Sequence, residues 1–179
     1  MTDMDRVWAD FQEPSGVRAQ YYGGEIVMQA NPTMLHDLVG KSIVRQVGEP
    51  YDAWGERGID LGTDGTPRPD VVILRLDDVD LTVRDLPVQL LQVVVEVVSP
   101  GKRAWHDDWH TKRELYAEHG IGWYLIVDPR PGTWHLLEHQ AASHVYTQHS
   151  EGIFGQGITV PLAQGALHLD SASWHPYPA

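Results

Sequence analysis

The chain has 179 residues, a formal net charge of −12, 42% hydrophobic and 21% charged residues, and no cysteine. These values predict one folded domain over residues 1–179 and exclude a disordered chain, a disulfide scaffold and a thiolate metal site. No apolar run is long enough to span a bilayer, and the acidic opening MTDMDRVWADF lacks the order of a signal peptide. We therefore expect a cytoplasmic protein with no membrane association.

Helical and extended patterns alternate along the first half of the chain. Two short strands are expected to turn at Gly23 and Gly24. The next segment favours a helix, with Asn31 as its cap and Pro32 in its first turn. In chain order, the expected elements are a helix over 5–11, two strands within 17–29, a helix over 31–49, a turn-rich connector over 63–69 and a strand over 69–76.

The second half contains the most strand-like stretch of the chain, LLQVVVEVV, which Pro100 and Gly101 end. In chain order, the expected elements are a loop over 76–89, a strand over 90–98, a helix over 105–119, a strand over 123–128 and short strands within 134–140, 143–149 and 166–169. This order predicts an α/β fold with a mixed central sheet flanked by helices.

Glu96 interrupts the apolar run of that stretch. An ionised carboxylate in an apolar strand is costly unless it is paired or binds a metal. Two ordinary explanations are exposure on an edge strand and a structural ion pair. The alternation of the strand supports exposure only weakly, because Val94 and Val98 share the face of Glu96 and are apolar.

Asp70 and Lys112 are candidate partners of Glu96. Asp70 begins an apolar strand directly after Pro69, although an ordinary turn aspartate is the plain alternative. Lys112 falls in a gap of the apolar helical stripe and so points toward the sheet; its plain alternative is a snorkelling lysine. Two carboxylates and a lysine are a device that can hold Mg²⁺, polarise a phosphodiester and activate a water.

Six segments match a known family in order and approximate spacing. They are YYGGEIVM, NPTMLH, RPDVVI, VVVEVVSP, the helical pattern of Asp108, Lys112 and Tyr116, and GIGWYLIVDP. On these segments the chain resembles the Uma2 (DUF820) family, whose fold belongs to the PD-(D/E)XK superfamily, and the likeness covers about residues 18–140. The resemblance implies a restriction-endonuclease-like core and an endonuclease that hydrolyses phosphodiester bonds, with DNA as the expected substrate.

The resemblance also implies roles for individual residues. Asp70 and Glu96 match the metal ligands, joined by the backbone carbonyl of Val97, and the expected ion is Mg²⁺ or Mn²⁺. Lys112 matches a helical lysine of Uma2-like sequences, whereas the superfamily pattern places the lysine where this chain has Val98. Accessory positions, each with an ordinary structural alternative, are Glu25, His36, Asp108 and Tyr116.

A zinc site is one competing interpretation. His106 and His110 stand at i and i+4 on an expected helix, and His135 and His139 would share a strand face. No third ligand is marked, and solvated surface histidines explain the same pattern.

A catalytically inactive binding or scaffold protein on the nuclease fold is the other alternative, since an acidic surface repels a phosphate backbone. Against it, the three catalytic positions are intact. A local basic rim beside the site could include Arg68, Lys102, Arg103, Lys112 and Arg113. Apolar edges within YYGGEIVM and WYLIVD, together with seven tryptophans, predict a homo-oligomer, with a dimer as the simplest case.

Overall fold

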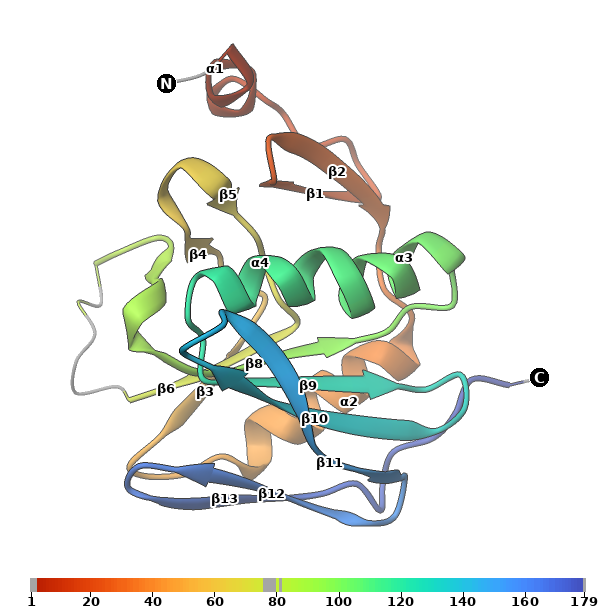
Figure 1. The fold of residues 1–179 in the computed structure, drawn as a ribbon. Coiled ribbons are helices and arrows are strands. Elements are labelled where there is room, and N and C mark those ends of the chain that lie inside the picture. Colours follow the sequence, from red (N-terminus) through yellow and green to blue (C-terminus); the bar gives the residue numbers. More distant parts are fainter. Residues whose placement is uncertain (1–2, 76–79, 81, 179) are drawn as a thin grey trace.

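The computed structural model describes residues 3–75, 80 and 82–178, and its centre is a six-stranded mixed sheet (Figure 1). The strands are β3 (Asp52–Gly55), β6 (Val71–Leu74), β8 (Leu91–Val97), β9 (Trp123–Asp128), β10 (Thr133–Gln140) and β11 (Val145–Ile153). Their order across the sheet is β11-β10-β9-β8-β6-β3. Only the β8–β9 pair of this sheet is parallel. The predicted mixed α/β fold is confirmed.

Helices cover both faces of this sheet. On one face, α2 (Met34–Gln46) packs Val39 and Ile43 against the strands. On the other face lies a continuous helical segment, which connects the parallel strands β8 and β9, as a parallel pair requires (Figure 1). It consists of α3 (Lys102–His106), the π-helical η4 (Asp107–Thr111) and α4 (Lys112–Glu118). The sheet therefore has a separate hydrophobic core on each side.

The alternation along β8 decides which core each side chain enters. Val93, Val95 and Val97 pack in the core under α2, whereas Val94 and Val98 pack in the core under α4. Glu96 therefore points toward the α3–η4–α4 segment, on the same face as two buried valines. This excludes the exposed-edge explanation, because β8 lies inside the sheet and Glu96 is buried.

Smaller elements surround the central sheet. The predicted turn at Gly23 and Gly24 is confirmed, with φ of 58° and 76°, and it joins the first two strands of a three-stranded sheet. That sheet contains β1 (Val17–Tyr22), β2 (Glu25–Ala30) and β5 (Gly65–Thr66). The remaining elements are α1 (Asp3–Ala9), β4 (Ile59–Asp60), η1 (Gly62–Asp64), β7 (Leu86–Pro87), η3 (Val88–Leu90), β12 (Gly157–Leu162) and β13 (Gly165–Asp170).

Several sequence predictions need correction. The N-cap of α2 is Thr33 and not Asn31, because the Thr33 side chain accepts a hydrogen bond from the backbone nitrogen of His36 at 3.3 Å. The helix expected from 105 begins three residues earlier, at Lys102. Strands β12 and β3, the latter an outer strand of the central sheet, were not expected. Within the expected loop 76–89, residues 76–79 and 81 lie outside the described part of the chain, and β7 and η3 form its end.

The apolar edges expected to support an oligomer are only partly present. Strand β9 lies between β8 and β10 and is not an edge, whereas β2 is an outer strand of the three-stranded sheet. The oligomeric state itself stays a prediction. Among the helices of the described residues, none has the length and apolar character needed to cross a bilayer.

Candidate active site

Asp70 stands directly before β6 and faces the end of β8. Because Val71 pairs with Val95 in antiparallel register, continuing the register by one residue places Asp70 opposite Glu96. The backbone nitrogen of Val97 donates to Asp70 Oδ2 at 2.7 Å, and His36 Nε2 lies 3.1 Å from the same oxygen. The carboxylate of Asp70 is thus held between a strand and helix α2.

Glu96 is 1% exposed, and both of its carboxylate oxygens have partners from the opposite helical segment. The hydroxyl of Tyr116 donates to Oε1 at 2.8 Å. The ammonium nitrogen of Lys112 lies 2.9 Å from Oε2. Glu96 is therefore tolerated inside the core because a buried cation and a buried hydroxyl solvate it.

Lys112 is 3% exposed and bridges two carboxylates. Besides Glu96, its ammonium donates to Asp108 Oδ1 at 3.0 Å, one helical turn away. This excludes the snorkelling alternative, because the ammonium group ends inside the protein. Lys112 therefore fills the expected gap in the apolar stripe of the helix with a buried positive charge.

The π-helical segment η4 shapes this part of the site. Inserting a wider turn into a helix disturbs its carbonyl bonding and is frequent at functional sites. Here the hydroxyl of Tyr124 donates to the backbone carbonyl of Asp108 at 2.7 Å, and the hydroxyl of Tyr22 donates to Asp107 Oδ2 at 3.3 Å. Tyr124 therefore satisfies a backbone carbonyl of the π-helical turn, Tyr22 binds the side chain of Asp107, and both aspartates are buried.

Burial dominates the electrostatics of the acids around Lys112. Burial raises the pKa of Glu96 well above its usual range, opposed by Lys112. Burial likewise raises the pKa of Asp108 to about 6. For Lys112, burial alone would lower the pKa, but Asp108 and Glu96 outweigh it, and the net pKa is raised. Lys112 therefore keeps its proton.

Asp70 and His36 influence each other in the opposite sense. Burial alone would raise the pKa of Asp70, but His36, with Lys112 and the backbone N–H of Val97, outweighs it, and the net pKa is lowered. Burial alone would lower the pKa of His36, but Asp70 outweighs it and the net pKa is raised. This pair therefore favours an ionised Asp70 beside a protonated imidazole.

A cavity of about 20 Å³ lies among these groups. About 10–15 Å³ is enough for one water, so the space suits a single water or metal ion. Its charged lining consists of His36, Asp70, Glu96, Asp108, Lys112, Arg18 and Arg68. The β1–β2 hairpin contributes Arg18, Gln20 and Gln29 to the lining. It lies on the side of the sheet that carries the α3–η4–α4 segment (Figure 1).

The structure brings most of the predicted site residues together. Those that line the cavity are Asp70, Glu96, Val97, Lys112, His36 and Asp108. Tyr116 contacts Glu96 from within the core. Glu25 is the exception: it is the exposed first residue of β2 and does not line the cavity.

The sequence analysis missed the polar face of the first hairpin. Arg18 and Gln20 alternate on β1, and Gln29 pairs opposite Arg18 on β2; all three line the cavity. Gln20 is buried and accepts a hydrogen bond from the backbone nitrogen of Arg68 at 2.9 Å. The alternation of polar residues with Ala19 and Tyr21 was the available signal.

The expected basic rim is only partly present. Arg68 and Lys112 line the cavity, and Lys102 and Arg103 are exposed on α3. Arg113 instead donates through Nη2 to the carbonyl of Tyr146 on β11, at 2.8 Å. Its charge is therefore directed away from the site.

The zinc interpretation finds no support in the described residues. The rings of His106 and His110 lie 4.9 Å apart between centroids, but both residues are exposed. His135 pairs with Glu151 at 3.1 Å. In the described part of the chain, no three or more His, Asp or Glu side chains are arranged to hold a metal ion.

The donor chemistry around Asp70 nevertheless fits a hard divalent cation. Glu96 and Asp108 are buried carboxylates, the side chain of Asp70 is 12% exposed, and Lys112 is the buried lysine beside them. Burial is the main cause of the raised pKa values of Glu96 and Asp108, and the neighbouring Asp70 adds to it. Carboxylate and carbonyl oxygens are the ligands that Mg²⁺ prefers, and a bound cation would offset the negative charge of these acids.

The sheet, its crossover helix and the buried carboxylate–lysine cluster define a restriction-endonuclease-like α/β protein. A crystal structure described as "a putative nuclease belonging to DUF820 from Anabaena variabilis ATCC 29413" has the same fold, with a TM-score of 0.64. The match covers 92% of this chain and 90% of that chain at 14% sequence identity.

The chain belongs to the Uma2 family, whose model, described as "Putative restriction endonuclease", matches residues 6–169. The predicted family and fold are confirmed. No curated protein matches the sequence.

Proposed function

We propose that this protein is a divalent-metal-dependent endonuclease of the PD-(D/E)XK type that hydrolyses phosphodiester bonds of DNA. One observation carries the proposal: Lys112 is buried between Glu96 and Asp108, at 2.9 and 3.0 Å, beside a small cavity that Asp70 also lines. Burying a lysine and two carboxylates beside a third, partly buried one costs stability, and such clusters occur at functional sites. The family description as a restriction endonuclease supports the same class.

In this proposal, Asp70 and Glu96 would hold Mg²⁺ or Mn²⁺, together with the backbone carbonyl of Val97. The ion would polarise the phosphodiester and make a bound water more acidic. Lys112 keeps its proton and supplies fixed positive charge where negative charge develops. Asp108 and Tyr116 hold Lys112 and Glu96 in place, and His36 orients Asp70.

A catalytically inactive scaffold is the alternative, and the net charge of −12 favours it. A protein that only binds has no need for a buried ammonium, since apolar residues of similar size fill a core at least as stably. The retention of Asp70, Glu96 and Lys112 around one cavity therefore favours catalysis over a scaffold role.

Plasmid cleavage with Mg²⁺ or Mn²⁺ tests the proposal. We expect wild-type protein to cleave, and both Asp70→Ala and Lys112→Ala to lose activity by about 100-fold or more, in line with the loss of a charge-stabilising group. Lys102→Ala is the matched control, because it removes an exposed lysine that does not line the cavity. Cleavage that persists in both site variants would point to a contaminant.

If well-folded wild-type protein cleaves neither plasmid, duplex nor single-stranded DNA, the scaffold alternative is favoured.

Residues 1–179 are proposed to form one catalytic domain. The predicted homo-oligomer is tested separately, by light scattering of the purified protein.

A further inference from the structure

A second, larger hollow opens directly beside the catalytic cavity. It is a groove of about 420 Å³ between α2 and the end of β3. His36 and Asp70 line both the groove and the catalytic cavity. The groove therefore adjoins the proposed site of hydrolysis across His36 and Asp70.

The groove follows one face of α2. Its lining residues recur at i and i+4 along the helix, first as His36, Gly40 and Val44 and then as Asp37, Lys41 and Arg45. Nine residues of helix separate His36 from Arg45, a rise of about 13 Å. A nucleic-acid strand rises about 3.4 Å per nucleotide, so the groove has the length of roughly four stacked nucleotides.

The charges in the groove are unevenly paired. Its acids have partners: Glu56 pairs with Arg18, and Asp37 lies 3.8 Å from His36 Nδ1. Among the described residues, no acid pairs with Lys41 or Arg45, and both are exposed. The chain carries 25 acids against 13 lysines and arginines. Two basic side chains beside this site that have no acidic partner among the described residues therefore point to an anionic ligand.

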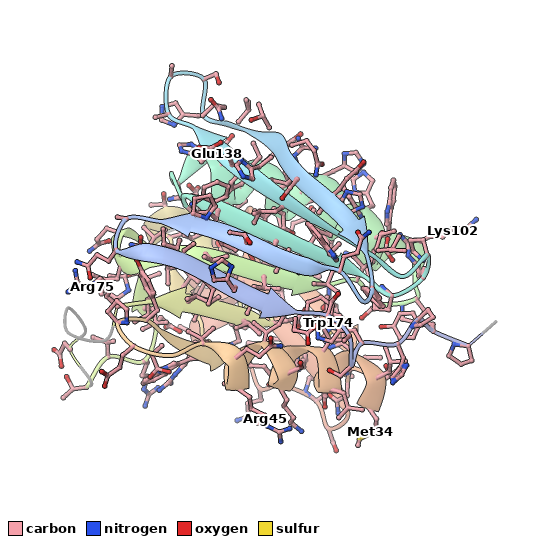
Figure 2. The ribbon with its side chains drawn as sticks, turned by 90° about the horizontal axis from the view of Figure 1, so that it is seen from below. Met34, Arg45, Arg75, Lys102, Glu138 and Trp174 are labelled. Carbon is pink, nitrogen blue, oxygen red and sulfur yellow. The ribbon has the colours of Figure 1, made fainter. Side chains whose placement is uncertain are left out.

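We propose that this groove holds the DNA strand on one side of the scissile phosphodiester. Lys41 and Arg45, one helical turn apart, contact successive backbone phosphates, and Arg45 extends outward from α2 (Figure 2). Gly40 and Val44 form an uncharged floor that leaves room for sugars and bases. The inference rests on the proposed nuclease function and accounts for how a protein of net charge −12 holds a polyanion.

Binding of a fluorescent 15-nucleotide single-stranded DNA in chelator tests the groove without cleavage. We expect Lys41→Ala/Arg45→Ala to weaken binding about tenfold or more and to lower the slope of log affinity against log salt by roughly 0.7 per lost contact. Arg84→Ala is the control, because it removes an exposed arginine that does not line the groove, and its affinity should stay within about twofold. Equal affinities of the double variant and wild type, or no wild-type binding, would overturn the inference.

Hydrolysis of bis(4-nitrophenyl) phosphate with Mn²⁺ separates the groove from the chemistry. This diester is too short to extend along α2, so the double variant should weaken DNA binding by a much larger factor than it lowers the rate of ester hydrolysis. If wild type hydrolyses neither ester nor DNA, the nuclease proposal fails. The binding measurement in chelator then still decides whether the groove binds DNA. If the double variant changes the mass measured by light scattering and leaves DNA affinity intact, the groove is an interface between copies and the inference is wrong.

Discussion

Lys112 and Glu96 form a buried ion pair of 2.9 Å that joins the crossover helix to the inside of the central sheet. Neither side chain is more than 4% exposed. A buried ion pair seldom stabilises a fold more than apolar residues of the same volume, so stability alone does not explain the pair. Its position beside Asp70, in a cavity the size of one ion, connects it with the proposed chemistry.

Removing the lysine of this pair should destabilise the protein strongly. Lys112→Ala leaves Glu96 and Asp108 buried without their cation, and we expect a loss of about 3–5 kcal/mol in the free energy of unfolding. Urea denaturation measures this loss. The double variant Glu96→Gln/Lys112→Met should recover part of it, because it removes both charges. If Lys112→Ala were as stable as wild type, Lys112 would not be needed to neutralise buried Glu96 and Asp108, and the prediction would be wrong.

Tyr116→Phe should separate the role of the hydroxyl from the packing of the ring. The variant loses the hydrogen bond to Glu96, with an expected cost of about 1–2 kcal/mol. Tyr146→Phe is the matched control, because its buried hydroxyl donates to the carbonyl of Ile121 at 2.6 Å, away from the cavity. Both variants should lose similar stability in urea, whereas only Tyr116→Phe should lower the cleavage rate.

Divalent metal should stabilise the folded protein. Binding of Mg²⁺ or Mn²⁺ to the folded state alone contributes about 2.7 kcal/mol at 100 times the dissociation constant, which raises the melting temperature. The charge-removing variants Asp70→Asn and Glu96→Gln should bind the ion at least tenfold more weakly by calorimetry. A wild type whose melting temperature and calorimetric heat do not respond to either ion would count against the proposed ligands.

The sequence and the structure assign the N-cap of α2 to different residues, Asn31 and Thr33, and stability measurements can distinguish them. Thr33→Ala should cost about 1 kcal/mol of stability, since the Thr33 side chain caps the helix, whereas Asn31→Ala should change it by less than about 0.5 kcal/mol. Guanidinium denaturation of the two variants decides between them. A larger loss for Asn31→Ala would restore the cap expected from the sequence.

The fold was largely predictable because the main strands and helices carry strong local patterns. The runs that became β8 and β9 are apolar and end at Pro100 and Pro129, and the helix that became α2 has its apolar residues at helical spacing. Strand β12 escaped prediction because its segment is short and lies among glycines, and it becomes a strand by pairing with β13. Both Asn31 and Thr33 are residue types that cap helices, and which of them caps α2 depends on backbone angles that residue preferences alone do not determine.

The sequence by itself determined which positions to examine. A glutamate in an apolar strand, an aspartate after a proline and a lysine in an apolar helical stripe are visible because each breaks a local rule. The tertiary structure decided that Glu96, Asp70 and Lys112 share one cavity, that Glu25 stays outside it, and that Gln20 and Arg18 enter it. Only strand register and helix packing set these distances, because the residues that meet are up to 94 positions apart in the chain, from Arg18 to Lys112.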